Sequence, residues 1–445
     1  MPKLHRFKIN GLYGERDIDI PFEDNVKIIV AENGYGKTTV LNTLYSLASG
    51  NISRLRKLSF ESLEIFFDDN SKHIVEKRML TFSSKLTEKH PFFDHLRRVL
   101  GEDEATALVE HFLTSGPNEF RRSSALLSAR KKTEIPSTTF MEYLSEIRKS
   151  IHNGADFSKA RDTLKKIQEK LDFNVLYLPT YRRVEQDFRD IRGGRDADDR
   201  GENLYDDFIN FGMIDVNKRI EELTSEILSS SVEWFSKVNG EMLGQLVEGF
   251  HVDENLKHSI QDPDAIKIVL DRIGGNIHEN QKKKILRLIR SGEIFTEHDP
   301  LIYFLSNLVK VYEQQKDNDK SIQKFVEVCN RYLGDKKLEY NESLVSVKIV
   351  RRKNNRDVDI ETLSSGEKQI ISLFCSLYLK KQESFALFFD EPELSLSIEW
   401  QKTLLPDVIN SGRCSFLFAT THSPFIFEND LSRFAVDLGH YITER

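Results

Sequence analysis

Apolar positions follow a two-residue period near both ends of the chain, whereas they recur every three or four residues through most of the middle. Alternation is typical of strands with one buried face, and continuous apolar runs are typical of strands buried on both faces. The pattern predicts alternating strands at 4–9, 18–22, 63–67 and 74–78, and buried strands at 26–30, 173–178, 385–389 and 414–420. The turn-forming residues 68–71 make 63–78 a predicted antiparallel hairpin.

The middle of the chain has the apolar period of amphipathic helices. It extends from about 84 to 172 and from 210 to about 333, and it predicts one long helix through 216–242. Heptad spacing is not sustained long enough for an extended coiled coil. Residues 189–203 hold almost no apolar side chain and are predicted to form a mobile linker. The pattern therefore predicts an α/β protein with a large helical insertion.

A glycine-rich turn joins the strand at 26–30 to a helix that begins at Lys37. Such a turn lets backbone N–H groups surround phosphates, and the helix N-terminus adds positive potential. We expect a nucleoside triphosphate here, with Lys37 on its phosphates and the Thr38 hydroxyl on Mg²⁺. The usual pattern has glycine where this chain has Ala31, the smallest replacement. The predicted nucleotide-binding residues are Asn33, Gly34, Tyr35, Gly36, Lys37, Thr38 and Thr39.

Three distant downstream segments supply the other residue types that phosphoryl transfer needs. Serines and a glycine begin a helix at 364–367, where N–H groups and hydroxyls can bind an anion. One buried strand ends in Asp390, expected in the Mg²⁺ shell, and Glu391, expected to orient and deprotonate the attacking water. The next delivers His422, expected to hydrogen-bond the γ-phosphate. The predicted catalytic residues are Glu391 and His422, and the helix start adds Ser364, Ser365, Gly366 and Glu367 to the nucleotide site.

Two further polar segments are candidates for binding. Gln186 follows the strand at 173–178, at the strand end where α/β sheets bind ligands, and is predicted to contact metal or water. The alternative is an ordinary surface segment. A predicted hairpin tip carries four cations that are candidates for contact with nucleic acid or a partner, namely Arg351, Arg352, Lys353 and Arg356. The alternative is that they only keep a sheet edge soluble.

The composition indicates how the protein can contact nucleic acid and in which compartment it works. The 445 residues carry 64 Lys and Arg against 71 Asp and Glu, a net charge of −7. We therefore expect DNA or RNA to be contacted only at local patches. Cys329, Cys375 and Cys414 lack the spacing of a disulfide framework or zinc site. No secretory signal or membrane span is expected, which indicates a soluble protein of the cytoplasm.

In this order, the segments resemble the ABC-type ATPases of the SMC, RecF and OLD-like group. AENGYGKTT is similar to their Walker A, LSSGEKQ to their signature, LFFDEPE to their Walker B, LSL to their D-loop and THSP to their switch. The resemblance implies an ABC-type P-loop ATPase head with a mixed sheet, flanking antiparallel strands and a large helical insertion. It also implies that two protomers clamp two ATP molecules, with Ser364 and Gly366 of one facing the nucleotide on Lys37 of the other. We therefore expect a homodimer, or a higher oligomer built from it.

The two halves of such a head lie at opposite ends of this chain. We predict an N-terminal half of the ATPase lobe (1–84), a helical insertion (85–172), a core strand with a Q-loop-like segment (173–190), a linker with a second helical insertion (191–335) and the C-terminal half of the lobe (336–445). The two halves must fold together to complete one site.

Within that group, the LPTYRRVE stretch, the compact helical middle and the chain end soon after His422 look like PtuA, the ATPase subunit of Septu antiphage systems and some retrons. This implies an HNH nuclease partner, PtuB, and in a retron a reverse transcriptase with its DNA–RNA product. We see no nuclease residues in the chain. The expected function is an ATPase of bacterial antiphage defence that controls a nuclease. The alternatives are a RecF- or SMC-like DNA-repair ATPase that clamps DNA and, third, a transporter ATPase.

Overall fold

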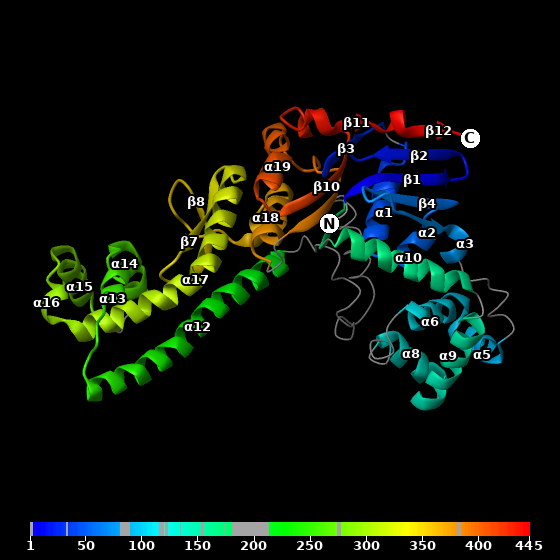
Figure 1. The fold of residues 1–445 in the computed structure, drawn as a ribbon. Coiled ribbons are helices and arrows are strands. Elements are labelled where there is room, and N and C mark those ends of the chain that lie inside the picture. Colours follow the sequence, from blue (N-terminus) through cyan, green and yellow to red (C-terminus); the bar gives the residue numbers. More distant parts are fainter. Residues whose placement is uncertain are drawn as a thin grey trace. The chain divides into compact units, whose positions relative to one another are not determined.

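The computed structural model divides the chain into two compact units. It describes residues 3–445 except 33, 81–89, 115–119, 121–122, 134, 153–154, 173, 180–212, 274–276 and 381–383. Unit 1 comprises Met1–Ile209 with Ser384–Arg445, and unit 2 comprises Asn210–Glu383. Unit 1 therefore contains both ends of the chain (Figure 1).

The first sheet of unit 1 is antiparallel and comes almost wholly from the N-terminal part of the chain. Its strands, in spatial order, are β12 (Ile442–Glu444), β2 (Arg16–Pro21), β1 (Leu4–Leu12), β4 (Ser62–Phe67) and β5 (Lys72–Glu76). Phe7 lies opposite Ile20, and Ile9 lies opposite Ile18. All four are at most 1% exposed, so this face of the sheet points to the core. The alternation in the sequence thus sets the pairing register.

The second sheet of unit 1 is parallel and joins distant parts of the chain. Its order is β11 (Ala435–Asp437), β3 (Val26–Val30), β10 (Cys414–Thr421), β9 (Phe385–Asp390) and β6 (Val175–Leu178). All residues of β9 are buried, as expected for a parallel strand covered on both faces. Because β10 lies between β3 and β9, the carboxyl ends of these three strands are neighbours.

One apolar core joins both sheets to the surrounding helices. The helices that contact it are α1 (Lys37–Ala48), α2 (Ile52–Lys57), α3 (Lys77–Leu80) and α10 (Ala155–Leu171). Within this core, the Arg54 guanidinium carbon lies 4.9 Å from the ring centroid of Tyr45 and 4.4 Å from that of Tyr177. The half-buried guanidinium therefore lies beside both aromatic rings. The C-terminal part of unit 1 adds α19 (Ile398–Asn410) and the short 3₁₀ turns η3 (Pro424–Ile426), η4 (Ser432–Phe434) and η5 (Leu438–Tyr441).

A separate helical cluster in unit 1 has an aromatic core. It consists of α5 (Pro91–Leu100), α6 (Glu102–Thr114), α8 (Ser124–Thr133) and α9 (Ser137–His152). The rings of Phe92 and Phe140 pack edge to face with centroids 5.2 Å apart, and Phe112 and Phe120 pack in the same way at 5.1 Å. These helices lie where the sequence predicted the first helical insertion.

Unit 2 is built on two long helices that lie side by side, α12 (Met213–Glu248) and α17 (Asp299–Tyr332) (Figure 1). The long helix predicted through 216–242 is part of α12. Four shorter helices come between them in the chain, namely α13 (Glu254–Ser259), α14 (Pro263–Arg272), α15 (Glu279–Ser291) and α16 (Ile294–Glu297). These helices share an apolar core with the first half of α17.

A buried ion pair fixes α14 against α17. Arg272 Nη2 lies 2.8 Å from both carboxylate oxygens of Asp319, and the two side chains are 8% and 2% exposed. The Tyr340 hydroxyl donates to the same carboxylate. Gln315 accepts from Arg272 and donates to the carbonyl of Ile227 in α12. Several partners for each charge offset the cost of burying it.

The last part of unit 2 contains β7 (Lys336–Asn341), β8 (Ser346–Arg351), η2 (Ile360–Thr362) and α18 (Ser365–Tyr378). The main partner of β8 is β7, which sequence reasoning missed because Leu338 is its only buried residue. After the basic turn that was predicted as a hairpin tip, the chain pairs back onto β8 only through an isolated bridge between Val350 and Asp357. Tyr332 of α17 packs against Phe374 of α18, with ring centroids 5.7 Å apart.

The predicted α/β fold class is confirmed, with parallel and antiparallel strands both present. They occupy separate sheets rather than alternating within one. The boundaries of the five predicted segments stay predictions. Unit 2 ends at Glu383, so the segment predicted as 336–445 is shared between the units. Gln186 and the linker predicted at 189–203 lie outside the described residues.

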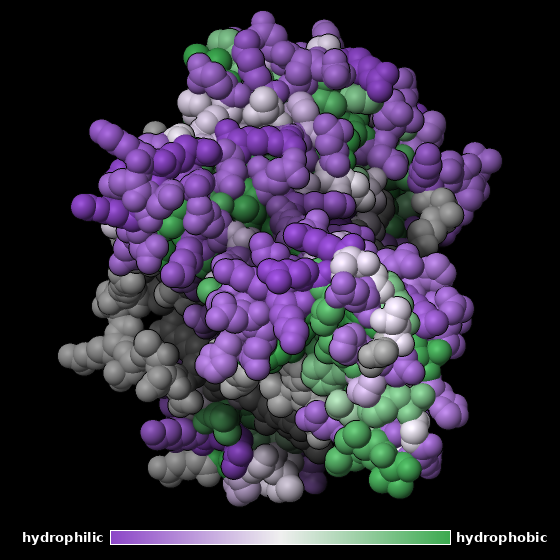
Figure 2. Space-filling model, turned by 90° about the vertical axis from the view of Figure 1, so that its left-hand side faces the viewer, coloured by the Kyte–Doolittle hydropathy of each residue, from purple (hydrophilic) through white to green (hydrophobic). Residues whose placement is uncertain are grey.

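The side of the molecule drawn in Figure 2 is largely hydrophilic, with one group of apolar residues near its lower right edge. Near the end of α12, Leu243, Leu246 and Val247 are 65%, 60% and 88% exposed. In the described part of the chain, no helix has both the length and the hydropathy to cross a membrane.

Candidate active site

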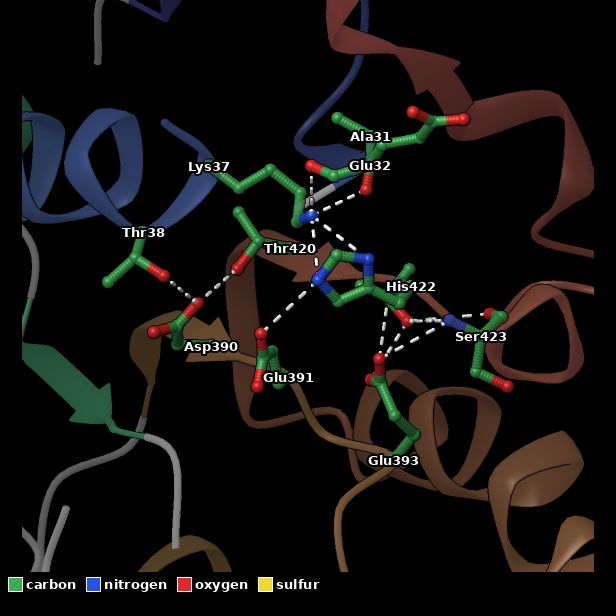
Figure 3. Close-up of polar contacts among 11 residues, drawn as sticks. Ala31, Glu32, Lys37, Thr38, Asp390, Glu391, Glu393, Thr420, His422 and Ser423 are labelled. Atoms are coloured by element: carbon green, nitrogen blue, oxygen red, sulfur yellow. Dashed lines mark hydrogen bonds and ion pairs between the residues drawn. The ribbon is translucent and has the colours of Figure 1, made fainter. Parts of the chain in front are cut away.

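Three segments converge at the carboxyl ends of β3, β9 and β10. The strands are in register, with Thr421 opposite Val30 and Thr420 opposite Asp390. The residues that follow each strand therefore lie around one point (Figure 3). In open α/β sheets this edge is where ligands bind.

The turn after β3 has the backbone of a phosphate-binding loop. Gly34 and Gly36 have φ of 90° and 87°, in the left-handed region that favours glycine. Ala31 is not in that region, so alanine is accommodated there without backbone strain. The Lys37 side chain turns back into the loop, where its Nζ lies 2.5 Å from the Ala31 carbonyl oxygen and 3.1 Å from that of Glu32. Its ammonium is thus held where a triphosphate would lie.

The other predicted loop residues surround this turn. Tyr35 is 42% exposed, and the guanidinium of Arg16 lies 5.6 Å from its ring centroid. Thr39 Oγ1 lies 2.8 Å from the hydroxyl of Tyr13, a contact that sequence reasoning missed. Asn33 lies outside the described residues.

Asp390 joins the helix after the loop to β10. Thr38 Oγ1 donates to Asp390 Oδ1 at 3.1 Å, and Thr420 Oγ1 donates to the same oxygen at 2.7 Å. Hydroxyl and carboxylate oxygens are the ligands that Mg²⁺ prefers, alongside phosphate and water. Across the described residues, no group of three or more His, Cys, Asp or Glu side chains could hold a metal ion by itself. Thr38 and Asp390 therefore fit an ion that arrives with a nucleotide.

His422 lies between Lys37 and Glu391. Lys37 Nζ is 2.8 Å from His422 Nε2 and 3.1 Å from Nδ1, and Nε2 is 3.4 Å from Glu391 Oε1 (Figure 3). Glu391 has a φ of 50°, a left-handed conformation that is uncommon outside glycine. Its N–H donates to the Thr420 carbonyl at 2.9 Å. Backbone strain of this kind clusters at functional sites.

The protonation of two of these groups is shifted by their surroundings. Burial raises the pKa of Glu391, and the neighbouring carboxylates of Asp390 and Glu393 raise it further. Burial lowers the pKa of Lys37, against the opposing effect of Glu391 and the other nearby carboxylates. A glutamate with a raised pKa holds a proton more readily than usual, which suits a general base.

Glu393 is the residue of this site that sequence reasoning missed. Its Oε1 accepts hydrogen bonds from the N–H of His422 at 2.7 Å and of Ser423 at 3.3 Å. Its Oε2 accepts from Thr421 Oγ1 at 2.8 Å. The signal in the sequence was the second acid of the EPE stretch, but only the path of the two loops shows what it contacts.

The second predicted anion-binding segment lies in unit 2. Ser364 caps α18 in a capping box: its N–H donates to Glu367 Oε2 at 2.8 Å, and its Oγ accepts from the N–H of Glu367 at 3.3 Å. Glu367 is 5% exposed, and Lys336 Nζ lies 2.9 Å from its Oε1. Its carboxylate is therefore engaged within the protein. Ser365 is exposed and Gly366 is buried in the first turn.

The basic turn after β8 is partly engaged in structural contacts. Arg351 Nη1 lies 2.5 Å from Asp335 Oδ2. Arg352 Nη2 donates to the carbonyls of Asn330 and Leu333 at 2.8 and 3.1 Å, so it caps the end of α17. Lys353 and Arg356 are exposed, and their side chains make no ion pair with the described residues.

A family model described as an AAA ATPase domain matches residues 3–427 of the chain. A Smc head domain from Pyrococcus furiosus, with an extended coiled coil bound to the C-terminal domain of ScpA, is 14% identical; 96% of this chain and 91% of that chain are covered, with a TM-score of 0.36. A Smc head domain with a coiled coil and joint from Pyrococcus yayanosii is 13% identical, with 96% and 93% covered and a TM-score of 0.31. No curated protein matches the chain.

Proposed function

Since the chain belongs to the AAA ATPase domain family, we propose that it binds ATP with Mg²⁺ at the turn after β3 and hydrolyses it. The observation that carries this proposal is the meeting of Lys37, Asp390, Glu391 and His422 at one edge of the parallel sheet. Because these groups follow three neighbouring strands, the sheet itself holds them together.

Each group has surroundings that support a specific role. The glycine turn and Lys37 would bind the phosphates. Thr38 and Asp390 would hold Mg²⁺, which when bound would neutralise phosphate charge and orient its oxygens. Glu391 would deprotonate the attacking water, and His422 would hydrogen-bond the γ-phosphate.

A second copy would complete the site. The support is the resemblance of LSSGEKQ to a signature segment, together with the exposure of Ser364 and Ser365 in unit 2. Ser364 and Gly366 of one copy would face the nucleotide held on Lys37 of the other. The predicted contact of Glu367 with the nucleotide would have to be indirect, through the cap it forms.

The finer proposal is that this ATPase serves bacterial antiphage defence. The resemblance to PtuA supports an HNH nuclease partner in the cytoplasm, and in a retron a reverse transcriptase with its DNA–RNA product. Copurification with an HNH protein is the expected result. A solitary protein that is constitutively bound to DNA would favour the RecF-like clamp, for which exposed Lys353 and Arg356 are the available cations.

The experiment compares ATP binding and hydrolysis by the wild type, Lys37→Ala and Glu391→Gln in the presence of Mg²⁺. Lys37→Ala should lose nucleotide binding. Glu391→Gln should keep binding but hydrolyse about 100-fold more slowly. A wild type that does not bind ATP would overturn the proposed function, and normal hydrolysis by Glu391→Gln would overturn the assignment of the base.

A further inference from the structure

We propose that Glu393 is a positioning residue that holds His422 against Lys37 and Glu391. This inference rests on the proposed ATPase function. It adds a role for a residue that makes no contact with Lys37 or Thr38 and lies beyond the expected Walker B acids.

The Glu393 carboxylate accepts several hydrogen bonds from one segment of the chain. The N–H groups of His422 and Ser423 donate to Glu393 (Figure 3), and the hydroxyl of Thr421 donates to it as well. Thr421 is the last residue of β10 and still pairs with Val30 of β3, whereas the two N–H groups come just after it, where the ladders to β3 and β9 have ended. Bonds to an ionised acceptor are stronger than neutral ones. Glu393 therefore replaces the lost sheet pairing for this segment.

A second side chain, Gln401, also holds this segment. Ser423 Oγ donates to Gln401 Oε1 at 2.6 Å, and Gln401 Nε2 donates to the Leu396 carbonyl at 3.0 Å. Gln401 belongs to α19 and Leu396 to the loop before it. The loop between β9 and α19 and the segment after β10 are thus joined by two independent side chains.

These contacts fix the position of the His422 ring. The ring of His422 is within 2.8 Å of Lys37 Nζ and 3.4 Å of Glu391 Oε1. Rotation of the His422 peptide would carry the ring away from both. Both oxygens of Glu393 accept hydrogen bonds from the segment that carries His422. Glu393 therefore acts through His422 rather than on the substrate.

The test compares Glu393→Ala, Glu393→Gln and Thr421→Val in the full chain. Glutamine keeps a carbonyl acceptor for the two N–H groups, whereas alanine removes all acceptors. We expect Glu393→Ala to lower kcat about 100-fold, because small misplacements of catalytic groups have effects of this size. Affinity for ATP should stay near that of the wild type, since Lys37 and Thr38 are untouched. Glu393→Gln should retain most of kcat, and Thr421→Val should lie between the two.

Two outcomes would overturn the inference. If Glu393→Ala hydrolyses ATP at the wild-type rate, the contacts do not matter for turnover. If Glu393→Gln is as slow as Glu393→Ala, the charge itself is needed and Glu393 takes part in the chemistry. A purely structural role would instead weaken ATP binding and lower Tm together.

A nucleotide-free measurement separates this inference from the proposed function. Amide hydrogen exchange at His422 should become about tenfold faster in Glu393→Ala, because a partly buried hydrogen bond to a carboxylate is lost. The result does not depend on ATP. If the wild type binds no ATP, the proposed function fails, but hydrogen exchange at His422 still tests the role of Glu393. If exchange at His422 is unchanged in Glu393→Ala, Glu393 does not position His422, even if the enzyme hydrolyses ATP.

Discussion

Glu391 combines a strained backbone with a crowded carboxylate. Its φ of 50° carries a steric cost, and its neighbours Asp390 and Glu393 repel its negative charge. His422 and Lys37 offset part of that repulsion. The side chain is thus kept in an arrangement that the fold alone does not favour, which is expected of a group retained for chemistry.

A pH-dependent effect on stability follows from this crowding. The folded pKa of Glu391 is raised, so stability is lost as pH rises from the ordinary glutamate value of about 4.3 through the folded pKa. In nucleotide-free protein, Glu391→Gln should therefore raise Tm near neutral pH and leave it nearly unchanged near pH 4. Thermal unfolding of both proteins across that range measures the effect. If Glu391→Gln lowers Tm relative to the wild type at neutral pH but not at pH 4, the predicted direction of the effect is wrong.

At the residue scale, the sequence predicted groups that follow strands and missed groups that act between loops. Asp390, Glu391 and His422 each end a buried apolar run, so parallel strand order brings them together. Glu393 does not end an apolar run. Its role depends on which loop passes which strand end, and periodicity carries no information about that.

The start of α18 depends on an ion pair that crosses between elements. Lys336 of β7 lies 2.9 Å from Glu367, and their side chains are 13% and 7% exposed. Removing one charge of a buried pair leaves the other uncompensated. The pair therefore keeps the Ser364 cap in place.

A double-mutant cycle tests this pair without ATP. Lys336→Met should lower the free energy of unfolding by about 3 kcal/mol. Adding Glu367→Gln should restore part of that loss, because the stranded carboxylate is removed. Urea unfolding of the wild type, both single variants and the double variant gives the coupling. Additive losses would show that the two groups do not interact.

Mutation can separate the structural role of the basic turn after β8 from its proposed contact with nucleic acid. Arg352→Ala should lower the free energy of unfolding by about 1 kcal/mol, because it removes hydrogen bonds to the carbonyls at the end of α17. Lys353→Ala and Arg356→Ala should leave stability unchanged. If the turn contacts nucleic acid, Lys353→Ala and Arg356→Ala should reduce the salt dependence of nucleic-acid binding while the protein stays folded. Urea unfolding and binding at several salt concentrations distinguish these cases.

At the element scale, helices and strands were predicted where one face, or the whole element, is buried in the core. The helix α12 and the strand β9 were predicted because their apolar residues recur with the period of the element that buries them. The strand β7 was missed because it is mostly polar and is held by its partner β8 and by Asn330, which exchanges hydrogen bonds with Leu338. Such pairing is decided by tertiary contacts rather than local sequence.

For the whole molecule, the proposed sharing of the site between copies makes a complementation prediction. Lys37→Ala would disable the phosphate loop, and Ser364→Arg would disable the segment offered to the other copy. Each variant alone should be inactive. An equal mixture should regain about a quarter of the wild-type rate, because half of the dimers are mixed and each has one complete site. The rate of ATP hydrolysis after mixing measures the recovery. If the mixture stays inactive although both variants are folded, the site is completed within one chain.

The position of β3 between β10 and β11 has a consequence for synthesis. Its neighbours β10 and β11 begin only at Cys414 and Ala435, so both edges of β3 stay open while the ribosome translates the residues in between. The antiparallel strands can pair locally in the meantime. We expect the nascent protein to need shielding by chaperones at β3, and prematurely terminated products to aggregate rather than accumulate as partly active enzyme.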